Sequence, residues 1–305
     1  MHVRPALTIV AGAAVISALV AAPVHAADVP TCFGRTATIV GGPPDPNVPD
    51  VSGTDGDDVI VTGNAGFATT GPGDDRICVT GTASFVAGGT GDDRIRVDGG
   101  SDYVSGDEGD DVIHVANGNA TYGYAGRDVI VDAGGGDVFG GEGFDVVAGT
   151  RDSSITIVDD AGPDLYYGAG NPENILSYTG SAGPVRIDLR RGRVRGPSGT
   201  DHLVRVRSVG GTSAPDVMIG DRHANRFFGV VFVGRLQSDP QMVGADVIRA
   251  GGGDDRIDAV GFGTRVLGQG GDDRIRTDAF ADGGGGTDQC DATTVVRCEG
   301  PVPIG

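Results

Sequence analysis

The sequence predicts an all-β solenoid, in which the chain winds into stacked coils, and three observations lead to this fold. Glycine- and aspartate-rich segments recur every 17 or 18 residues, and the same position of each segment carries an isoleucine or a valine. Glycine accounts for 56 of the 305 residues, whereas ordinary proteins contain about 7%. A fixed short period over many copies is typical of stacked repeats, because each repeat buries its apolar face against its neighbours.

Eight segments carry the repeat, in two blocks. The first block holds GTDGDDVIV (53–61), TGPGDDRIC (70–78), GGTGDDRIR (88–96), GDEGDDVIH (106–114), GYAGRDVIV (123–131) and GGEGFDVVA (140–148), and the second holds AGGGDDRID (250–258) and GQGGDDRIR (268–276). The segments between the copies mostly lack an acid at the sixth position, with Asp102 and Asp137 as exceptions. This alternation predicts one row of acidic loops along a single edge of the solenoid.

Within each copy, the alternation of apolar and polar residues indicates a short strand with one buried face. Position eight points inward and forms an apolar row of Ile60, Ile77, Ile95, Ile113, Ile130, Val147, Ile257 and Ile275. Positions seven and nine point outward, because neighbouring side chains of a strand face opposite sides. They include the arginines Arg76, Arg94, Arg96, Arg256, Arg274 and Arg276. We interpret these arginines as charge balance beside acidic loops rather than as a ligand site.

The copies resemble the G-G-x-G-x-D-x-U-x nonapeptides of the RTX, or haemolysin-type calcium-binding, proteins. The resemblance covers most of residues 51–150 and 211–282. It implies a right-handed parallel β-roll, in which six residues of each nonapeptide form a turn and three form a strand. Two nonapeptides then complete a coil of about 18 residues.

The resemblance also implies calcium as the cofactor, held at the glycine of position four and the aspartate of position six. The expected metal-binding residues are Gly56, Asp58, Gly73, Asp75, Gly91, Asp93, Gly109, Asp111, Gly126, Asp128, Gly143, Asp145, Gly253, Asp255, Gly271 and Asp273. Calcium takes about six to eight oxygen ligands from carboxylates and backbone carbonyls, whereas zinc requires clustered cysteine or histidine. Folding should then depend on calcium, because stacked carboxylates repel one another without it. The alternative is that these residues only form turns.

Four positions depart from the pattern, and we expect weaker or absent metal sites there. Arg127 and Phe144 replace the acid of position five in the last two copies of the first block. In the segments 211–219 and 220–228, Ala214 replaces the glycine of position four and Asn225 replaces the aspartate of position six.

The N-terminus is typical of a cleavable secretory signal. An arginine precedes an apolar run from Ala6 to Ala22, and the small residues of Val24-His25-Ala26 predict cleavage after Ala26. A transmembrane anchor is the alternative, but a run of about 17 residues lies at the lower limit for spanning a bilayer. The prediction is a secreted, extracellular protein. The net charge of −19 disfavours nucleic acid and membrane insertion and favours cations as partners.

We divide the chain into a signal peptide (1–26), an N-terminal cap (27–50), a calcium-binding β-roll (51–150), an irregular β-solenoid spacer (151–210), a second β-roll block (211–282) and a C-terminal cap (283–305). In a secreted chain, the four cysteines favour two disulfides out of three possible pairings. We expect Cys32–Cys78, because Cys78 occupies an outward strand position near the N-terminal cap, and Cys290–Cys298 in the C-terminal cap.

The sequence contains no catalytic motif that we can identify: HExxH, G-x-S-x-G and a P-loop are all missing. We therefore expect a calcium-binding protein with a structural, surface or binding role and no enzymatic activity. An adhesin or carbohydrate-contacting solenoid, with a cell-surface glycan or protein as partner, stays open. A polysaccharide lyase or epimerase is a further alternative, with Asp159, Asp160, Asp164, Tyr166, Tyr167 and Tyr178 as candidates. We favour turn acids and strand tyrosines for these residues.

Overall fold

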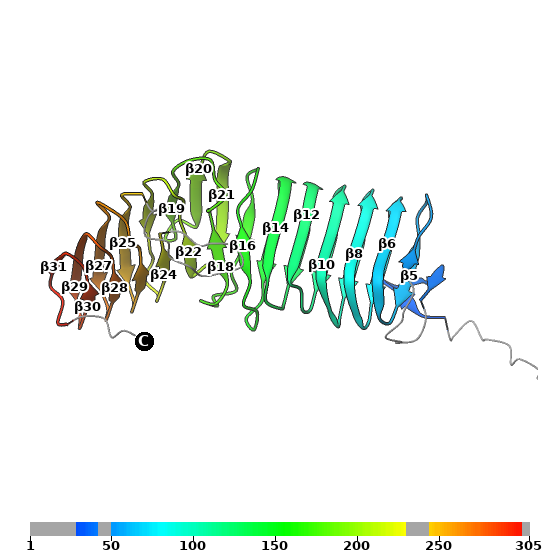
Figure 1. Ribbon diagram of the computed structural model, residues 1–305, viewed down its shortest axis with the longest axis horizontal. Helices are drawn as coiled ribbons and strands as arrows, with labels where there is room; N and C mark the ends of the chain where they lie inside the picture. Colours follow the sequence, from blue (N-terminus) through cyan, green and yellow to red (C-terminus); the bar gives the residue numbers. More distant parts are fainter. Residues whose placement is uncertain (1–28, 42–49, 230–243, 301–305) are drawn as a thin grey trace, which may run out of the picture.

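The computed structural model describes residues 29–41, 50–229 and 244–300, and these form an elongated stack of β-coils (Figure 1). The predicted signal peptide therefore lies outside the described residues. No helix long and apolar enough to cross a membrane is found in the described part. Coils of 17 or 18 residues are seen in the strand register, where Ile60 lies beside Ile77 and Phe67 beside Phe85. The predicted all-β solenoid is confirmed.

Two long sheets face each other across the core, and the chain alternates between them. The 13-stranded sheet contains, in spatial order, β4 (Val51–Ser52), β6 (Ala65–Pro72), β8 (Thr82–Thr90), β10 (Gly100–Glu108), β12 (Ala120–Gly126), β14 (Asp137–Gly143), β16 (Thr156–Val158), β18 (Ile175–Ser177), β22 (Ser208–Gly210), β24 (Arg226–Phe228), β26 (Arg256–Asp258), β28 (Arg274–Arg276) and β30 (Gln289–Asp291). All its neighbouring strands are parallel.

The 16-stranded sheet contains, in spatial order, β3 (Ile39–Val40), β5 (Val59–Thr62), β7 (Arg76–Val79), β9 (Arg94–Val97), β11 (Val112–Val115), β13 (Val129–Asp132), β15 (Val146–Gly149), β17 (Leu165–Tyr167), β21 (Gly199–Val204), β20 (Arg193–Gly196), β19 (Arg186–Asp188), β23 (Val217–Ile219), β25 (Val247–Gly252), β27 (Arg265–Gly270), β29 (Phe280–Gly285) and β31 (Thr294–Val296). It is parallel except around β20, which runs antiparallel to both of its neighbours.

The core is the apolar row that the repeats predict. The eight residues at position eight are all buried between the sheets: Ile60, Ile77, Ile95, Ile113, Ile130, Val147, Ile257 and Ile275. In the first block, the 13-stranded sheet faces this row with smaller residues, such as Ala68, Val86 and Val104. Arg94 and Arg96 point outward on either side of Ile95, as predicted. Strand alternation therefore places the charged residues of the repeats on the outside of the coil.

A stack of aromatic rings covers part of the outer face of the 13-stranded sheet. Phe67, Phe85, Tyr103, Tyr122 and Phe139 come from five successive coils. The centroids of neighbouring rings lie 4.6 to 5.7 Å apart. The rings of Tyr122 and Phe139 are almost parallel, with an interplanar angle of 2°. Ring stacking of this kind adds to the free energy gained from strand pairing.

The spacer continues both sheets, and it also carries an antiparallel insertion that the sequence did not predict. β16, β18 and β22 extend the 13-stranded sheet. In the 16-stranded sheet, β17 pairs with β21. β19, β20 and β21 then form a three-stranded meander within the 16-stranded sheet. The meander adds two strands to one sheet without adding any to the other.

Both predicted disulfides are confirmed, at opposite ends of the stack. Cys32–Cys78 joins the hairpin of β1 (Thr31–Cys32) and β2 (Arg35–Thr36) to the outer face of β7. The hairpin also covers Val59 and Val61, which explains why these outward positions are apolar. Cys290–Cys298 closes a short loop in the last coils.

Candidate metal site

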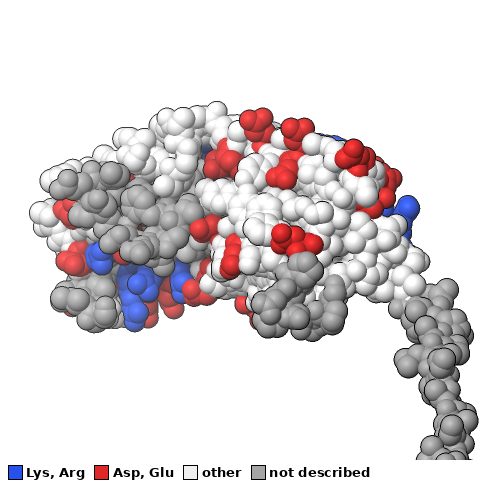
Figure 2. Space-filling model, turned by 45° about the vertical axis from the view of Figure 1, so that its right-hand side comes forward, with Lys and Arg blue, Asp and Glu red and all other residues white. Residues whose placement is uncertain are grey.

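The acidic loops of the first block follow one edge of the solenoid. Asp58, Asp75, Asp93, Asp111, Asp128 and Asp145 each come directly before a strand of the 16-stranded sheet. They therefore lie where the chain crosses from the 13-stranded sheet to the 16-stranded sheet. We call this side of the solenoid the first edge. Figure 2 shows acidic side chains gathered along an edge of the N-terminal half, which faces the viewer.

Backbone amides bind the position-six aspartates together from coil to coil. The amide of Asp93 donates to Oδ1 of Asp111 at 2.8 Å, and the amide of Asp111 donates to Oδ1 of Asp128 at 2.9 Å. The same bond recurs from Asp58 to Asp145 and continues to Asp164 and Asp201 in the spacer. We call these residues the first aspartate row.

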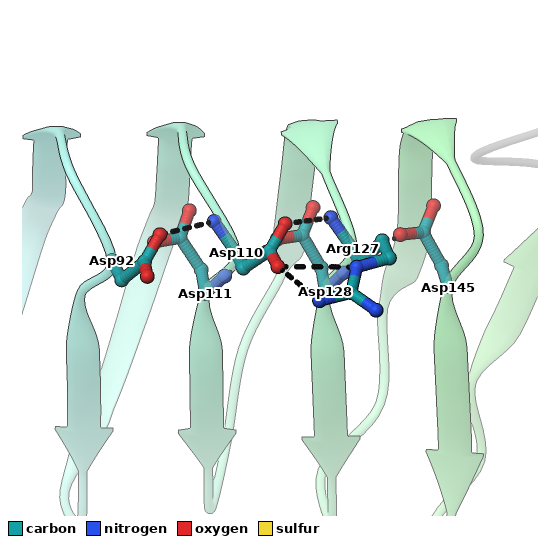
Figure 3. A network of polar contacts seen from close by, with 6 residues as sticks. All are labelled: Asp92, Asp110, Asp111, Arg127, Asp128 and Asp145. Atoms are coloured by element: carbon teal, nitrogen blue, oxygen red, sulfur yellow. Dashed lines mark hydrogen bonds and ion pairs between the residues drawn. The ribbon is translucent and has the colours of Figure 1, made fainter.

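The position-five aspartates form a second line of bonds that runs in the opposite direction. Here the amide of Asp110 donates back to Oδ1 of Asp92 at 2.9 Å, as Figure 3 shows. The line ends at Arg127, whose amide and guanidinium both bind Asp110. Phe144 provides no side-chain acceptor in the next coil. The departure expected at these two positions thus ends the position-five line.

The second carboxylate oxygen of most row members has no partner. Within the described residues, no hydrogen-bond donor reaches Oδ2 of Asp75, Asp93, Asp111, Asp128 or Asp145, although these atoms are buried. A buried carboxylate oxygen without a partner is costly, because it has lost its water. The oxygen therefore requires a proton or a cation. Asp58 differs, since its Oδ2 accepts bonds from the amide and hydroxyl of Thr54.

Glycines leave the space around most of the unpartnered oxygens. A Cβ on Gly106, at position one, would lie 2.0 Å from Oδ2 of Asp111, and a Cβ on Gly88 would lie 2.1 Å from Oδ2 of Asp93. The Gly88 Cβ would also lie 2.7 Å from the Gly106 carbonyl oxygen of the next coil. Carboxylate and carbonyl oxygens of successive coils thus meet beside these glycines. The copies of Asp75 and Asp255 have Thr70 and Ala250 at position one instead.

The predicted glycines of position four allow the coils to stack closely. Gly109 has a φ of 138°, and a Cβ there would lie 2.0 Å from the carbonyl oxygen of Gly91. Gly73, Gly91, Gly126, Gly143, Gly253 and Gly271 share the positive φ. Gly56 does not, and its Cβ would meet nothing within 4 Å. The steric requirement for glycine therefore begins at the second copy.

Burial raises the pKa of Asp93, Asp111 and Asp128 in the first row, and neighbouring carboxylates add to the effect. The pKa of Asp93 rises to about 7, that of Asp111 to about 8 and that of Asp128 to about 7. The main cause is the loss of water around the charge, while the amide bonds to Oδ1 partly offset it. Without a cation, the row is therefore poorly suited to full ionisation at neutral pH.

The prediction of a single row along one edge is wrong. Asp255 and Asp273 come before β26 and β28, which belong to the 13-stranded sheet, so they lie at the opposite edge. They form a second aspartate row with Asp288: the amide of Asp255 donates to Asp273 at 2.9 Å, and that of Asp273 donates to Asp288 at 2.9 Å. Oδ2 is again buried and without a donor in all three, within the described residues.

Further residues take part in the rows besides the expected metal-binding residues, and each lacks the full nonapeptide signal. At the first edge, Asp246 accepts the amide of Asp216 and keeps an unpartnered Oδ2, although no G-x-G-x-D precedes it. Asp216 has both oxygens bonded by Thr212 and the Val185 amide. Asn225 lies at the opposite edge, where its backbone amide donates to Oδ1 of Asp255 at 2.7 Å. The sequence signal that could have identified the aspartates is an aspartate directly before a short strand, about one coil away from the next such aspartate.

An acidic cluster lies inside the spacer and includes Asp164 and Asp201 of the first aspartate row. Carboxylate oxygens of Asp159, Asp164 and Asp201 all lie within 4.8 Å of one another, and all three residues are buried. The hydroxyl of Tyr166 lies 3.0 Å from Asp164, and that of Tyr178 lies 2.9 Å from Asp201. Of the six candidates from this region, Asp160 lies beside the cluster with its Oδ2 on the Gly141 amide, and Tyr167 contacts Arg205 outside it.

The cluster differs from the nonapeptide part of the first aspartate row, because every carboxylate oxygen in the cluster has a donor nearby. Ser198 and Tyr166 approach Asp159, and the amides of Asp145 and Asp164 bind the remaining oxygens. Burial raises the pKa of Asp159 to about 8, so a shared proton can relieve the charge without metal. Asp201, which belongs to the cluster, was not expected from the sequence.

The donor set of the two rows fits a hard cation. Each row offers carboxylate and carbonyl oxygens, which are the ligands that hard cations prefer. Comparison with models of known protein families gave no match, and no curated protein matched the chain either.

Proposed function

We propose that this protein is a secreted calcium-binding β-roll of the RTX type, which folds when calcium fills the two aspartate rows. Its role is structural or adhesive, and it carries no catalytic domain. The observation that carries the proposal is the series of buried Oδ2 atoms that have no donor within the described residues, in rows at both edges.

Calcium is favoured over other ions by the chemistry and the space of the loops. Oxygen ligands exclude a preference for zinc, and a loop of glycine carbonyls and carboxylates is flexible enough for the high coordination number of calcium. Magnesium requires a tighter octahedral shell and keeps several waters, for which the buried loops offer little room. The bound ion would neutralise adjacent carboxylates and supply the missing partner for each Oδ2.

Secretion is supported by two features, the N-terminal signal pattern and the two disulfides. Disulfides persist in oxidising compartments, and both cysteine pairs of the chain are joined. Outside the cell, calcium at about millimolar levels would suffice for loops of this kind.

The decisive experiment is far-ultraviolet circular dichroism of the chain without its first 26 residues, titrated with calcium from chelator. A cooperative gain of β signal with calcium, and none with magnesium, is expected. A protein that is fully folded in chelator and indifferent to calcium would overturn the proposal.

A matched pair of variants locates the effect in the row. Asp93→Asn keeps an oxygen for the Asp75 amide but places an NH₂ group where the unpartnered Oδ2 lies, so the calcium midpoint should rise. Asp98→Asn, in the same coil, removes an exposed carboxylate that pairs only with Arg96, and the midpoint should stay unchanged. Equal shifts in both variants would rule out the row as the metal site.

A further inference from the structure

The spacer contains a concentration of arginine that the calcium proposal does not explain. Five of the ten residues from 186 to 195 are arginine, in a chain whose net charge is −19. They belong to β19, β20 and the turn between them.

Strand register brings these arginines onto one outer face. Ile187 and Val194 pair across β19 and β20 and are fully buried, so their neighbours point outward. Arg186 then lies directly opposite Arg195, and Arg193 opposite Asp188. Between them is a hollow of about 380 Å³, lined by Arg186, Asp188, Arg191, Arg193 and Arg195.

The hollow has an excess of positive charge. Asp188 is its one acid, and it is already shared by Arg191 at 3.0 Å and Arg190 at 3.6 Å. Within the described residues, no ion pair joins Arg186, Arg193 or Arg195 to a carboxylate. Like charges directly opposite each other destabilise a strand pair, so Arg186 and Arg195 lower the stability of the meander unless an anion lies between them.

The basic surface extends along the solenoid beyond the hollow. In the strand register across β23, Arg249 on β25 lies in line with Asp188, and Arg265 on β27 lies in line with Arg186. Both arginines are exposed. Neighbouring strands lie about 4.8 Å apart, and Val217 and Val247 lie between Arg186 and Arg265, so the next arginine on this line is three strands, or roughly 14 Å, away. This spacing suits a ligand several sugar units long rather than a single sugar.

We propose that the outer face of β19 and β20, which we call the arginine face, binds an acidic polysaccharide through its carboxylate or sulfate groups. Guanidinium groups form paired hydrogen bonds with such anions. The hollow is too small for more than a few sugar units, and the extended basic surface suits a linear chain. No aromatic residue lines the hollow, whereas single-stranded nucleic acids are usually held by stacking on aromatic rings.

The test measures binding of fluorescent decasaccharides to the mature protein in saturating calcium. The probes are oligogalacturonate, a sulfated galactan of the same length, neutral dextran and a single-stranded DNA decamer. Arg186→Gln/Arg195→Gln should weaken binding of an acidic decasaccharide by roughly tenfold or more. The same variant should melt at an unchanged or slightly higher temperature, because it removes a like-charge pair.

Arg76→Gln/Arg94→Gln is the matched control, because these arginines also lie side by side on the outer face of the 16-stranded sheet. It removes the same charge and should bind as the wild type does. Failure of the wild type to bind either acidic probe would overturn the proposal, as would equal weakening in both double variants or equal binding of dextran. Tighter binding of the DNA would show that the ligand class is wrong. The arginine face lies outside the metal rows, so these outcomes are independent of the calcium titration.

Discussion

The guanidinium of Arg127 lies 2.6 Å from the carboxylate of Asp110 in the preceding coil. The pair ends the position-five line of aspartates, and hydrogen bonding to Arg127 lowers the pKa of Asp110. Both side chains are exposed, and exposed ion pairs add little to stability. We therefore expect Arg127→Met to leave the thermal unfolding temperature in saturating calcium nearly unchanged. A clear drop would mean that this pair, rather than the buried row, holds the coils together.

Position-one glycines should be essential where a row oxygen lies against them. In Gly106→Ala, the new Cβ would lie 2.0 Å from Oδ2 of Asp111 and 2.7 Å from its Cγ, so the loop must shift. We expect a loss of about 1–3 kcal/mol in the free energy of unfolding with calcium present, together with a higher calcium midpoint. Urea unfolding at saturating calcium measures the first quantity.

Gly56→Ala is the control for this substitution, because a Cβ there meets nothing within 4 Å and the backbone φ is not positive. It should be neutral or slightly stabilising, since alanine restricts the unfolded chain. Similar losses at both glycines would argue against a crowded oxygen site at Asp111.

The metal-free protein should lose stability as the pH rises. Burial raises the folded-state pKa of Asp93 to about 7 and that of Asp111 to about 8, above the ordinary aspartate value of 3.8. The resulting stabilisation is complete below pH 4 or so and is lost as the pH passes through about 7 to 8, where the folded carboxyls give up their protons.

In chelator, we therefore expect a larger β signal in far-ultraviolet circular dichroism at pH 5 than at pH 8. In saturating calcium, the urea midpoint should instead be higher at pH 8, because the ion binds the deprotonated carboxylates. Identical β signals at both pH values in chelator would contradict the burial of these groups without a partner.

The two disulfides should contribute unequally. Cys32–Cys78 spans 46 residues and ties the N-terminal hairpin to β7, whereas Cys290–Cys298 spans only 8. Because longer loops gain more from closure, Cys32→Ala/Cys78→Ala should cost about 4 kcal/mol and Cys290→Ala/Cys298→Ala nearer 2–3 kcal/mol. Calorimetry of both variants in calcium checks the order, and a larger loss for the C-terminal pair would contradict it.

The regular part of the fold could be predicted because each residue of a nonapeptide has a fixed direction. Ile95 had to point inward and Arg94 and Arg96 outward, and Cys78 had to lie near an N-terminal cap. The carboxylates at the first edge follow from the same register. Their unpartnered oxygens could not be predicted, because the sequence does not say which oxygen the neighbouring amide binds.

The edge of the second block could not be predicted either. Two nonapeptides make a coil, so a shift by one nonapeptide transfers a loop to the other edge. That shift cannot be read from the sequence, because the irregular spacer between Asp145 and Asp255 interrupts the period. The copy with Asn225 at position six also departs from the pattern. The meander that pairs Arg186 with Arg195 was missed because antiparallel pairing within a parallel sheet leaves no periodic signal.

The first aspartate row also has a polarity. Each position-six amide depends on the carboxylate of the following coil, so a defect at Asp111 is felt first at Asp93, its neighbour on the N-terminal side. The position-five line transmits in the other direction, but it stops at Arg127. Beyond that residue the dependence is one-way. Damage to a late coil therefore spreads toward the beginning of the chain, and a truncation that removes Asp145 or Asp164 would leave the coil before it incomplete, while the coils after a damaged one keep their acceptors.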